Sequence, residues 1–201
     1  AMPMVFSGEH YINGLSHEVT IPAIKNSMMF ALLATVVDVV LGCLIAWIIV
    51  RSTLPLRGFI DAMSMLPLAV PGLVLAFGYL AISFQLKHWL GEHALMEHLD
   101  VQKNPATLLV IAYAVRRLPY VVRSAVAGLQ QTPPDLELAA RNLGASPLTT
   151  VRRIMIPLIA ANLLAGALLA FAFAMLEVSD SLILAQKQAY WPITKAIYEL
   201  F

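Results

Sequence analysis

Two aspartates stand within strongly apolar runs, where a carboxylate is most informative. Asp38 lies near the middle of the run at residues 24–50, and Asp61 lies in the next run, at residues 59–84. A pair of carboxylates can do acid and base chemistry in an intramembrane hydrolase, but these two lie on different runs and no dyad signature surrounds them. Because an isolated carboxylate is costly in an apolar setting, Asp38 is expected to face a polar path or to hydrogen-bond a neighbouring helix.

Histidine and glutamate recur in the polar segment 85–104, which raises the question of a metal site. The residues concerned are His88, Glu92, His93, Glu97 and His98. Three residues separate His93 from Glu97, where the inverted zinc motif has two, so the spacing fits no established zinc signature. The preferred interpretation is a solvated amphipathic loop helix, and neither a metal nor another cofactor is expected.

Composition places the chain in a membrane. Hydrophobic residues make up 60% of the 201 residues and charged residues only 12%, about half the usual share of a soluble domain. The formal net charge of +1 provides no clustered basic surface, so no nucleic-acid partner is expected. The single cysteine, Cys43, lies in an apolar run and is read as a small buried hydrophobic residue.

Long apolar runs must position these side chains. Four of them are long enough to cross a hydrocarbon core, which takes about 20 helical residues. They cover residues 24–50, 59–84, 105–129 and 154–176, and a further run begins at Ile193. We therefore expect an all-α membrane protein, a polytopic helix bundle with about five spans in a single domain over residues 1–201. Residues 1–23 are expected at the external interface, and the sequence is expected to be a fragment, truncated at both ends.

Helix breakers interrupt the second run at Pro67, Pro71 and Gly72. Breaks of this kind free backbone polar groups, which are tolerated at membrane depth only against protein or a water-filled cavity. Residues 66–72 are therefore predicted to form a kink, which either lines a path or allows neighbouring helices to pack around it.

Two arginines, Arg116 and Arg117, lie deep in the third run. Exposure to lipid would be costly, so their side chains are expected to snorkel or to face the protein interior. A role in tying this span to the adjacent loop is preferred over contact with an anionic solute.

Polar residues also gather after the fourth run, as Glu177, Ser179, Asp180 and Ser181. They are interpreted either as capping and solvation of a helix end or as the polar mouth of a translocation path.

Residues 132–157 form a polar island between apolar runs. Thr132 and the two prolines after it are typical of a helix start, with the Thr132 hydroxyl able to cap. Gly144 predicts the end of that helix. Ser146 followed by Pro147 predicts the start of a second one, so the segment is expected to form two short helices with a glycine elbow.

The first short helix is predicted to have one apolar face of small width. Its members recur at helical spacing and are Leu136, Ala139, Ala140 and Leu143. Glu137 and Arg141 are four residues apart and are expected to pair with each other on another face.

This island resembles the "EAA" signature of the permease subunits of binding-protein-dependent ABC importers. The signature reads E-A-A, three residues, G, nine residues, I-x-L-P, and the matching residues are Ala139, Ala140, Gly144, Ile154 and Pro157. Leu138 stands where the signature has glutamate, with Glu137 one position earlier, and Ile156 replaces the leucine. In the family this segment is the cytoplasmic coupling helix that docks into a groove of the ATP-hydrolysing subunit. The resemblance therefore implies a coupling role for Glu137, Ala139, Ala140, Arg141, Gly144, Ala145, Ile154 and Pro157.

The resemblance extends over nearly the whole chain and implies the type I importer permease fold. Residues 177–184 are most similar to permeases of the iron(III), phosphonate, thiamine and polyamine branch. The implied location is the bacterial cytoplasmic membrane. The implied partners are a separate ATPase, a second permease half or an identical copy, and a soluble solute-binding protein. The implied cargo is iron(III) or another small ion or organic solute.

The resemblance implies that the chain is a transport subunit rather than an enzyme. No stretch matches the phosphate-binding motif G-x-x-x-x-G-K-[ST], so ATP hydrolysis is expected on another chain. Alternating access would arise from helices that move as the ATPase moves. Candidate path residues are Asp38, Pro67, Pro71, Gly72, Glu177, Ser179 and Asp180. A membrane scaffold without transport would explain the spans but neither the broken second run nor the signature.

Charge distribution predicts which side faces the cytoplasm. The turn at residues 51–57 has two arginines and no acid, and residues 123–153 have four arginines against two acids. The segment 85–104 has two lysines against three acids. Because lysine and arginine favour the inner side, the island at residues 132–157 is expected in the cytoplasm.

Overall fold

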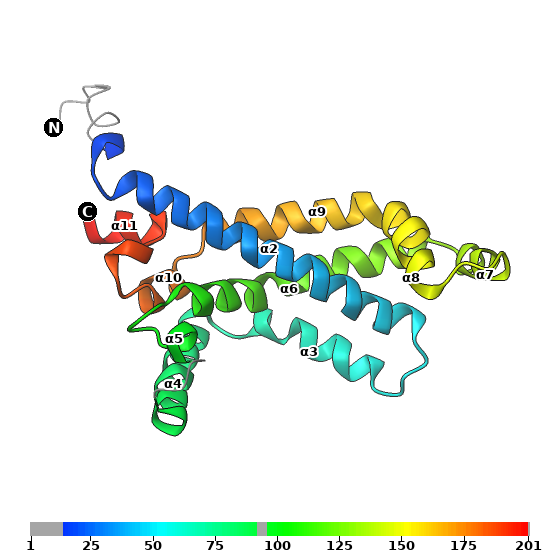
Figure 1. Cartoon of the computed structure of the whole chain (residues 1–201), viewed down its shortest axis with the longest axis horizontal. Helices are drawn as coiled ribbons and strands as arrows, with labels where there is room; N and C mark the ends of the chain where they lie inside the picture. Colours follow the sequence, from blue (N-terminus) through cyan, green and yellow to red (C-terminus); the bar gives the residue numbers. More distant parts are fainter. Residues whose placement is uncertain (1–13, 92–95, 201) are drawn as a thin grey trace.

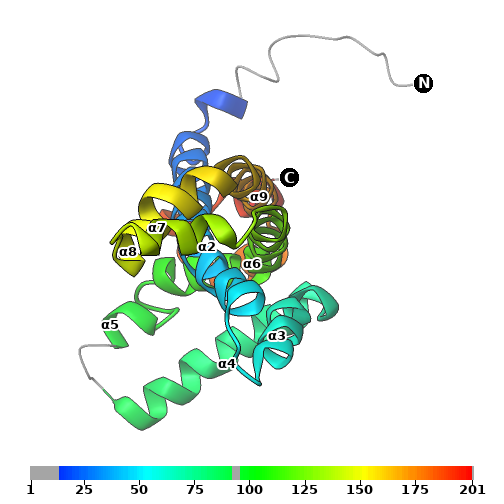
Figure 2. The same ribbon diagram turned by 90° about the vertical axis from the view of Figure 1, so that its right-hand side faces the viewer.

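Three long helices form the body of the molecule. The computed structural model describes residues 14–91 and 96–200, and within them every regular element is helical. α2 (Thr20–Arg51), α6 (Ala106–Gln131) and α9 (Ile156–Met175) pack against one another along the long axis (Figure 1). Seen end on, they form a three-cornered bundle (Figure 2). The chain is thus the all-α bundle that its apolar runs predict.

Small residues allow the three helices to approach closely. A Cβ added to Gly42 of α2 would lie 2.8 Å from a side-chain carbon of Val121, and one added to Gly166 of α9 would lie 2.8 Å from Cβ of Ser124. Ser124 also donates a hydrogen bond of 2.6 Å to the backbone carbonyl of Asn162. Between helices that face lipid, such close packing replaces the hydrophobic effect as the main source of association.

The second run, residues 59–84, is interrupted within the predicted residues 66–72, but by a complete break between two helices rather than by a kink. The structure has two helices, α3 (Arg57–Ala69) and α4 (Gly72–Leu90), and α4 leaves the bundle at an angle (Figures 1 and 2). Val70 between them is extended, with ψ of 131°, as expected before a proline. The break therefore lies at Val70 and Pro71, whereas Pro67 lies inside α3.

Shorter elements connect the long ones. They are α5 (Met96–Leu99), α7 (Asp135–Asn142), α8 (Pro147–Thr150), the π-helix η1 (Val151–Met155), α10 (Ser179–Leu184), the 3-10 helix η2 (Gln188–Tyr190) and α11 (Ile193–Leu200). α7 and α8 lie at one end of the bundle, and α10 and α11 lie toward the other (Figure 1).

Three helical stretches are long and apolar enough to cross a membrane. They are Thr20–Arg51, Gly72–Leu90 and Pro147–Met175. α6 lies in the middle of the bundle but carries Arg116, Arg117 and Arg123. About five spans were expected. The structure supports the all-α class of fold, but its described residues contain fewer helices that are long and apolar enough to cross a membrane.

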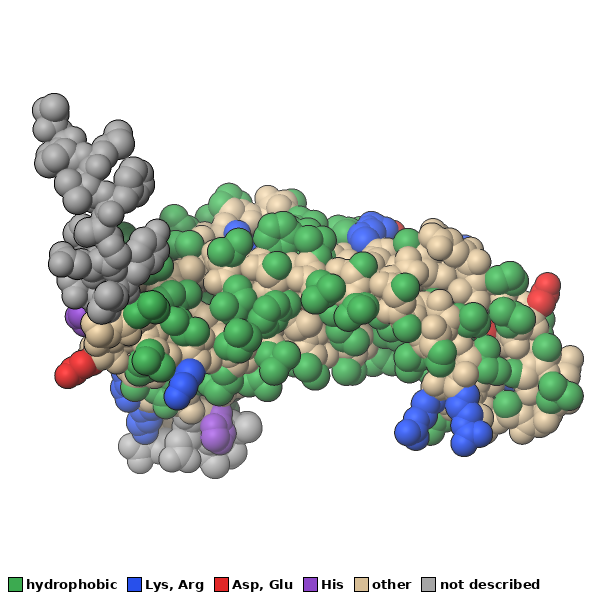
Figure 3. Space-filling model, turned by 90° about the horizontal axis from the view of Figure 1, so that it is seen from above, with side chains coloured by type: hydrophobic (Ala, Val, Ile, Leu, Met, Phe, Trp, Pro, Cys, Tyr) green, Lys and Arg blue, Asp and Glu red, His purple; other side chains and the backbone are tan. Residues whose placement is uncertain are grey.

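Apolar side chains also cover the outside of the bundle. Met28, Leu32, Val36 and Leu44 of α2 are each about half exposed. In the view from above, hydrophobic side chains are spread over the middle of the molecule, and most of the charged side chains lie toward its two ends (Figure 3). A surface of this kind is stable in contact with lipid or another apolar protein face.

Candidate functional site

The glycine elbow forms as the sequence predicts. Gly144 has φ of +87°, in the left-handed region that favours glycine, and it ends α7. Its backbone N–H donates to the carbonyl of Arg141 at 3.0 Å. α8 then begins with Ser146 as its N-cap, whose Oγ accepts a 3.3 Å hydrogen bond from the backbone N–H of Thr149. The two short helices therefore have well-defined inner ends.

Two expected contacts in the first short helix are wrong. The Thr132 hydroxyl does not cap α7, because it donates to the carbonyl of Gly128 at 3.0 Å and so bonds the end of α6. Glu137 does not pair with Arg141, which is exposed. Its carboxylate instead accepts a 2.7 Å hydrogen bond from Nε of Arg51, the last residue of α2. A pairing at four-residue spacing was thus displaced by a more buried cation from another helix.

The predicted apolar face of α7 divides between two environments. Ala140 is buried within the chain, with 7% of its surface exposed, so it is not available to a partner. Leu143, in contrast, is 90% exposed, and Leu148 on α8 is 76% exposed. Large apolar side chains at the tip of a polar segment are typical of a binding surface. The outward surface of the elbow therefore includes Leu143 and Leu148, whereas Ala140 packs against its own chain.

The other residues assigned to the segment lie as follows. Ala139 and Pro157 are exposed, while Ala145 and Ile154 are partly buried. Pro157 lies in the first turn of α9, which the π-helix η1 joins to α8. The segment thus continues without interruption into a membrane helix.

A second group of charged residues lies inside the bundle. Glu177, at the end of α9, is only 4% exposed and forms ion pairs with Arg117 and with Arg116, the latter at 3.3 Å. It also accepts a 3.1 Å hydrogen bond from the backbone N–H of Ser179. The two arginines therefore face the protein interior, one of the two placements expected for them, and a carboxylate compensates their charge.

The helix break at Gly72 belongs to the same group. A Cβ at Gly72 would lie 2.4 Å from Nη2 of Arg116, so the guanidinium rests directly on the backbone at the start of α4. Asp180 is completely buried and lies within electrostatic reach of Glu177 and both arginines. The structure thus brings Gly72 close to Glu177 and Asp180, which lie more than one hundred positions later in the sequence.

Asp38 lies on the bundle side of α2. It is 1% exposed, and neither of its carboxylate oxygens has a hydrogen-bond partner among the described residues. Arg117 lies within electrostatic reach of this carboxylate. Asp61 lies on α3 and forms a 3.1 Å ion pair with Arg123, so it has a different partner. The arrangement gives no support to a hydrolytic pair of aspartates.

The expectations for the loop after α4 can be followed only in part. Glu92 and His93 lie outside the described residues, and the described ones contain no group of three metal-ligating side chains.

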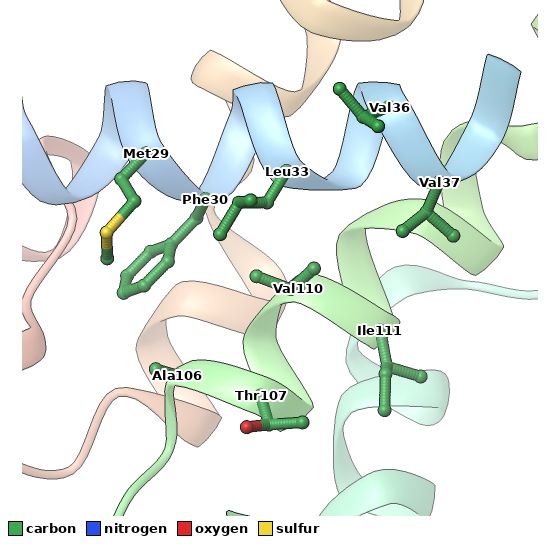
Figure 4. A pocket seen from close by; sticks show the side chains of 9 residues that line it. All are labelled: Met29, Phe30, Leu33, Val36, Val37, Ala106, Thr107, Val110 and Ile111. Atoms are coloured by element: carbon green, nitrogen blue, oxygen red, sulfur yellow. The ribbon is translucent and has the colours of Figure 1, made fainter. Parts of the chain in front are cut away.

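A groove between α2 and the start of α6 is lined almost entirely by apolar side chains, among them Phe30, Leu33 and Val110 (Figure 4). It offers no charged group to an ion.

Comparison with known proteins identifies the family. Residues 38–199 match the binding-protein-dependent transport system inner membrane component family. The chain belongs to this family. Its fold is accordingly the helix bundle of the type I ABC importer permeases, and the elbow at residues 132–157 lies within the matched region.

Individual relatives differ in the solute that their names state. The chain is 34% identical to the probable sulfate transport system permease of Marchantia polymorpha, over 83% of this chain and 57% of that protein. It is 28% identical to the molybdate/tungstate transport system permease of Methanocaldococcus jannaschii, over 100% of this chain and 78% of that protein. It is 29% identical to the ferric transport system permease of Actinobacillus pleuropneumoniae, over 79% of this chain and 21% of that protein. The chain spans less than two thirds of the length of the sulfate relatives.

Proposed function

We propose that this chain forms the membrane path of an ATP-driven importer. A soluble binding protein would deliver the solute, and a separate ATPase would hydrolyse ATP. Family membership and the apolar membrane helices support this proposal. They also support a place in the bacterial cytoplasmic membrane, with the exposed apolar faces covered by lipid or a second permease subunit.

One observation carries the proposal of an ATPase partner: the exposed leucines on the elbow. Leu143 and Leu148 lie at the end of the bundle, on two short helices whose relative orientation Gly144 and Ser146 determine. α7 follows α6 in the chain, and α8 leads through η1 into α9. A partner that held this elbow could therefore move two helices of the bundle as packed bodies, which is how alternating access is produced.

The solute proposed here is a small inorganic ion. The relatives named above are described as sulfate, molybdate/tungstate and ferric permeases, so iron(III) is one candidate beside the oxyanions. The path is proposed to pass the residues around the helix break and the buried charges. These are Asp38, Pro67, Pro71, Gly72, Glu177, Ser179 and Asp180.

Substitution of Leu143 tests the ATPase contact. Leu143→Asp should leave the permease in the membrane, because the side chain packs against little of its own chain, but should prevent the ATPase from co-purifying. Leu15→Asp is the control, since Leu15 is 58% exposed and precedes α2, whose N-terminal end lies at the end of the bundle away from α7 and α8 (Figure 1). Normal ATPase binding and ion uptake by Leu143→Asp would refute this docking surface.

A further inference from the structure

Arg51 connects three helices through one guanidinium group. It is the last residue of α2, and its Nε donates to Oε1 of Glu137 on α7 at 2.7 Å. Its Nη2 donates to two backbone carbonyls, Leu129 at 3.0 Å and Thr132 at 2.7 Å. The side chains of Arg51 and Glu137 are only 13% and 17% exposed. The contacts are therefore shielded from water in large part, which strengthens them.

Both carbonyls lie at the C-terminal end of α6, where the carbonyl of Leu129 also accepts a 3.3 Å hydrogen bond from the backbone N–H of Thr132. The last carbonyls of a helix have no partner in the next turn and carry the negative end of the helix dipole, so a cation there is favourable. Leu129 lies in the last turn of α6, and Thr132 is its C-cap. Arg51 thus completes the end of α6 while it binds Glu137, and both interactions use one rigid, planar side chain.

The connection matters because α2 is not joined to α7 along the chain. α7 follows α6 closely and leads to α9, whereas more than eighty residues lie between Arg51 and Glu137, a separation of 86 positions. α2 carries the buried Asp38 and packs along α6 and α9. A movement of α7 reaches α6 and α9 through the backbone, and Arg51 gives α7 a direct hydrogen bond to α2 in addition to the packing of α2 on α6 and α9.

We propose that Arg51 is a positioning residue for transport. It transmits the movement of the elbow to α2, and it keeps the end of α2 attached to the end of α6. This inference rests on the proposed function. It also assigns Glu137 a partner within the chain, so that this carboxylate holds α7 in place and the exposed leucines contact the ATPase.

Variants of Arg51 test the transmission separately from docking. Arg51→Gln should still co-purify with the ATPase, but ion uptake per ATP hydrolysed should fall about fivefold or more, the usual size of coupling between two sites. Arg51→Lys should show an intermediate loss, because an ammonium group cannot reproduce the planar fork. Arg57→Gln is the matched control, since Arg57 is an exposed arginine of the same turn. It should keep the wild-type ratio of uptake to hydrolysis.

Glu137→Gln tests the same contact from the side of its acceptor, and it replaces Arg51→Gln as the test if that variant does not accumulate in the membrane. It should lower the ratio, and combining it with Arg51→Gln should add little, because residues that act through one contact are not additive. An unchanged ratio in both variants would overturn the inference, and so would loss of ATPase binding by Arg51→Gln. If Leu143→Asp fails to affect ATPase binding, the proposed function fails; if only the Arg51 and Glu137 variants behave as wild type, the inference alone fails.

Discussion

Arg117 and Glu177 form an ion pair inside the bundle although they lie 60 positions apart in the sequence. Their side chains are 12% and 4% exposed, and Arg117 also donates a 3.1 Å hydrogen bond to the carbonyl of Phe173. Arg116 shares the same carboxylate at 3.3 Å. One acid therefore compensates two cations, and it joins the middle of α6 to the end of α9.

The first prediction concerns the removal of that acid. Glu177→Gln keeps the size of the side chain but removes the carboxylate that forms ion pairs with both arginines, so the free energy of unfolding should fall by about 3 to 5 kcal/mol. Thermal unfolding of the purified protein in detergent measures the change. Glu199→Gln is the control, because Glu199 is 41% exposed and pairs with Lys195 only at 3.5 Å, so its loss should cost less than about 1 kcal/mol. Equal losses of stability in the two variants would contradict the role of Glu177 as the buried partner of Arg116 and Arg117.

The second prediction concerns the backbone on which Arg116 rests. Gly72→Ala would place a methyl group 2.4 Å from the guanidinium, so Arg116 must move away from its position beside Glu177. Ion uptake should fall, while the amount of protein in the membrane should change little. Gly78→Ala in the same helix meets nothing within 4 Å and should be neutral or slightly stabilising, because alanine favours a helix over glycine by about 1 kcal/mol. Wild-type uptake by Gly72→Ala would show that Arg116 can shift without consequence.

The sequence predicts those features that depend on neighbouring residues. The long helices α2 and α9 follow from apolar runs, and the elbow follows from a glycine end and a serine start a few residues apart. The pairs Arg51–Glu137 and Arg117–Glu177 cannot be read in this way, because each joins residues that only the packed helices bring together. Glu137 shows the difference most clearly, since a local partner was expected and a distant one is present.

The second span illustrates another limit. A proline at position 71 indicates that residue 70 is extended, but a kink and a complete break begin with the same local signal. Which of them forms depends on what the next helix contacts. Here Gly72 lies against Arg116 and α4 contacts α10, so α4 takes a direction of its own.

The third prediction concerns acid sensitivity at the connection between α4 and α6. Asp100 is 1% exposed, and it pairs with Lys87 at 2.8 Å and accepts from the N–H of Gln102 at 2.9 Å. Burial by itself would raise the pKa of the Asp100 carboxyl, but the ion pair with Lys87 and the hydrogen bond from the Gln102 N–H outweigh it and hold the pKa below its ordinary value. The ion pair therefore stabilises the fold at pH values above about 3.9, and this contribution is lost as the pH falls further.

Asp100→Asn should accordingly lower stability at neutral pH, and the difference from the wild type should shrink as the pH falls below about 4. Unfolding in detergent followed from pH 7 to pH 3 checks this dependence. Glu18→Gln, at an exposed position outside this connection, should leave the profile as it is. A difference that stays constant with pH would mean that the asparagine disturbs packing rather than charge.

The last prediction concerns the elbow itself. Gly144 has φ of +87°, and a Cβ there would meet nothing within 4 Å, so a larger side chain is opposed by backbone strain alone. Gly144→Val should cost about 1 to 2 kcal/mol locally and change the angle between α7 and α8. Because that angle sets the positions of Leu143 and Leu148, ATPase binding should weaken and ion uptake should fall. Pull-down of the ATPase with the solubilised permease, together with uptake into vesicles, measures both.

Gly91 supplies the matched control, since it has φ of +57° and equally open surroundings at the end of α4. Because ψ of Gly91 is −134°, outside the left-handed helical region, Gly91→Val should carry at least as much local strain, but it should not weaken ATPase binding because it lies outside residues 132–157. Reduced binding in both variants would show that strain anywhere in the chain is enough. Normal binding and uptake by Gly144→Val would show that the angle of the elbow does not control the contact.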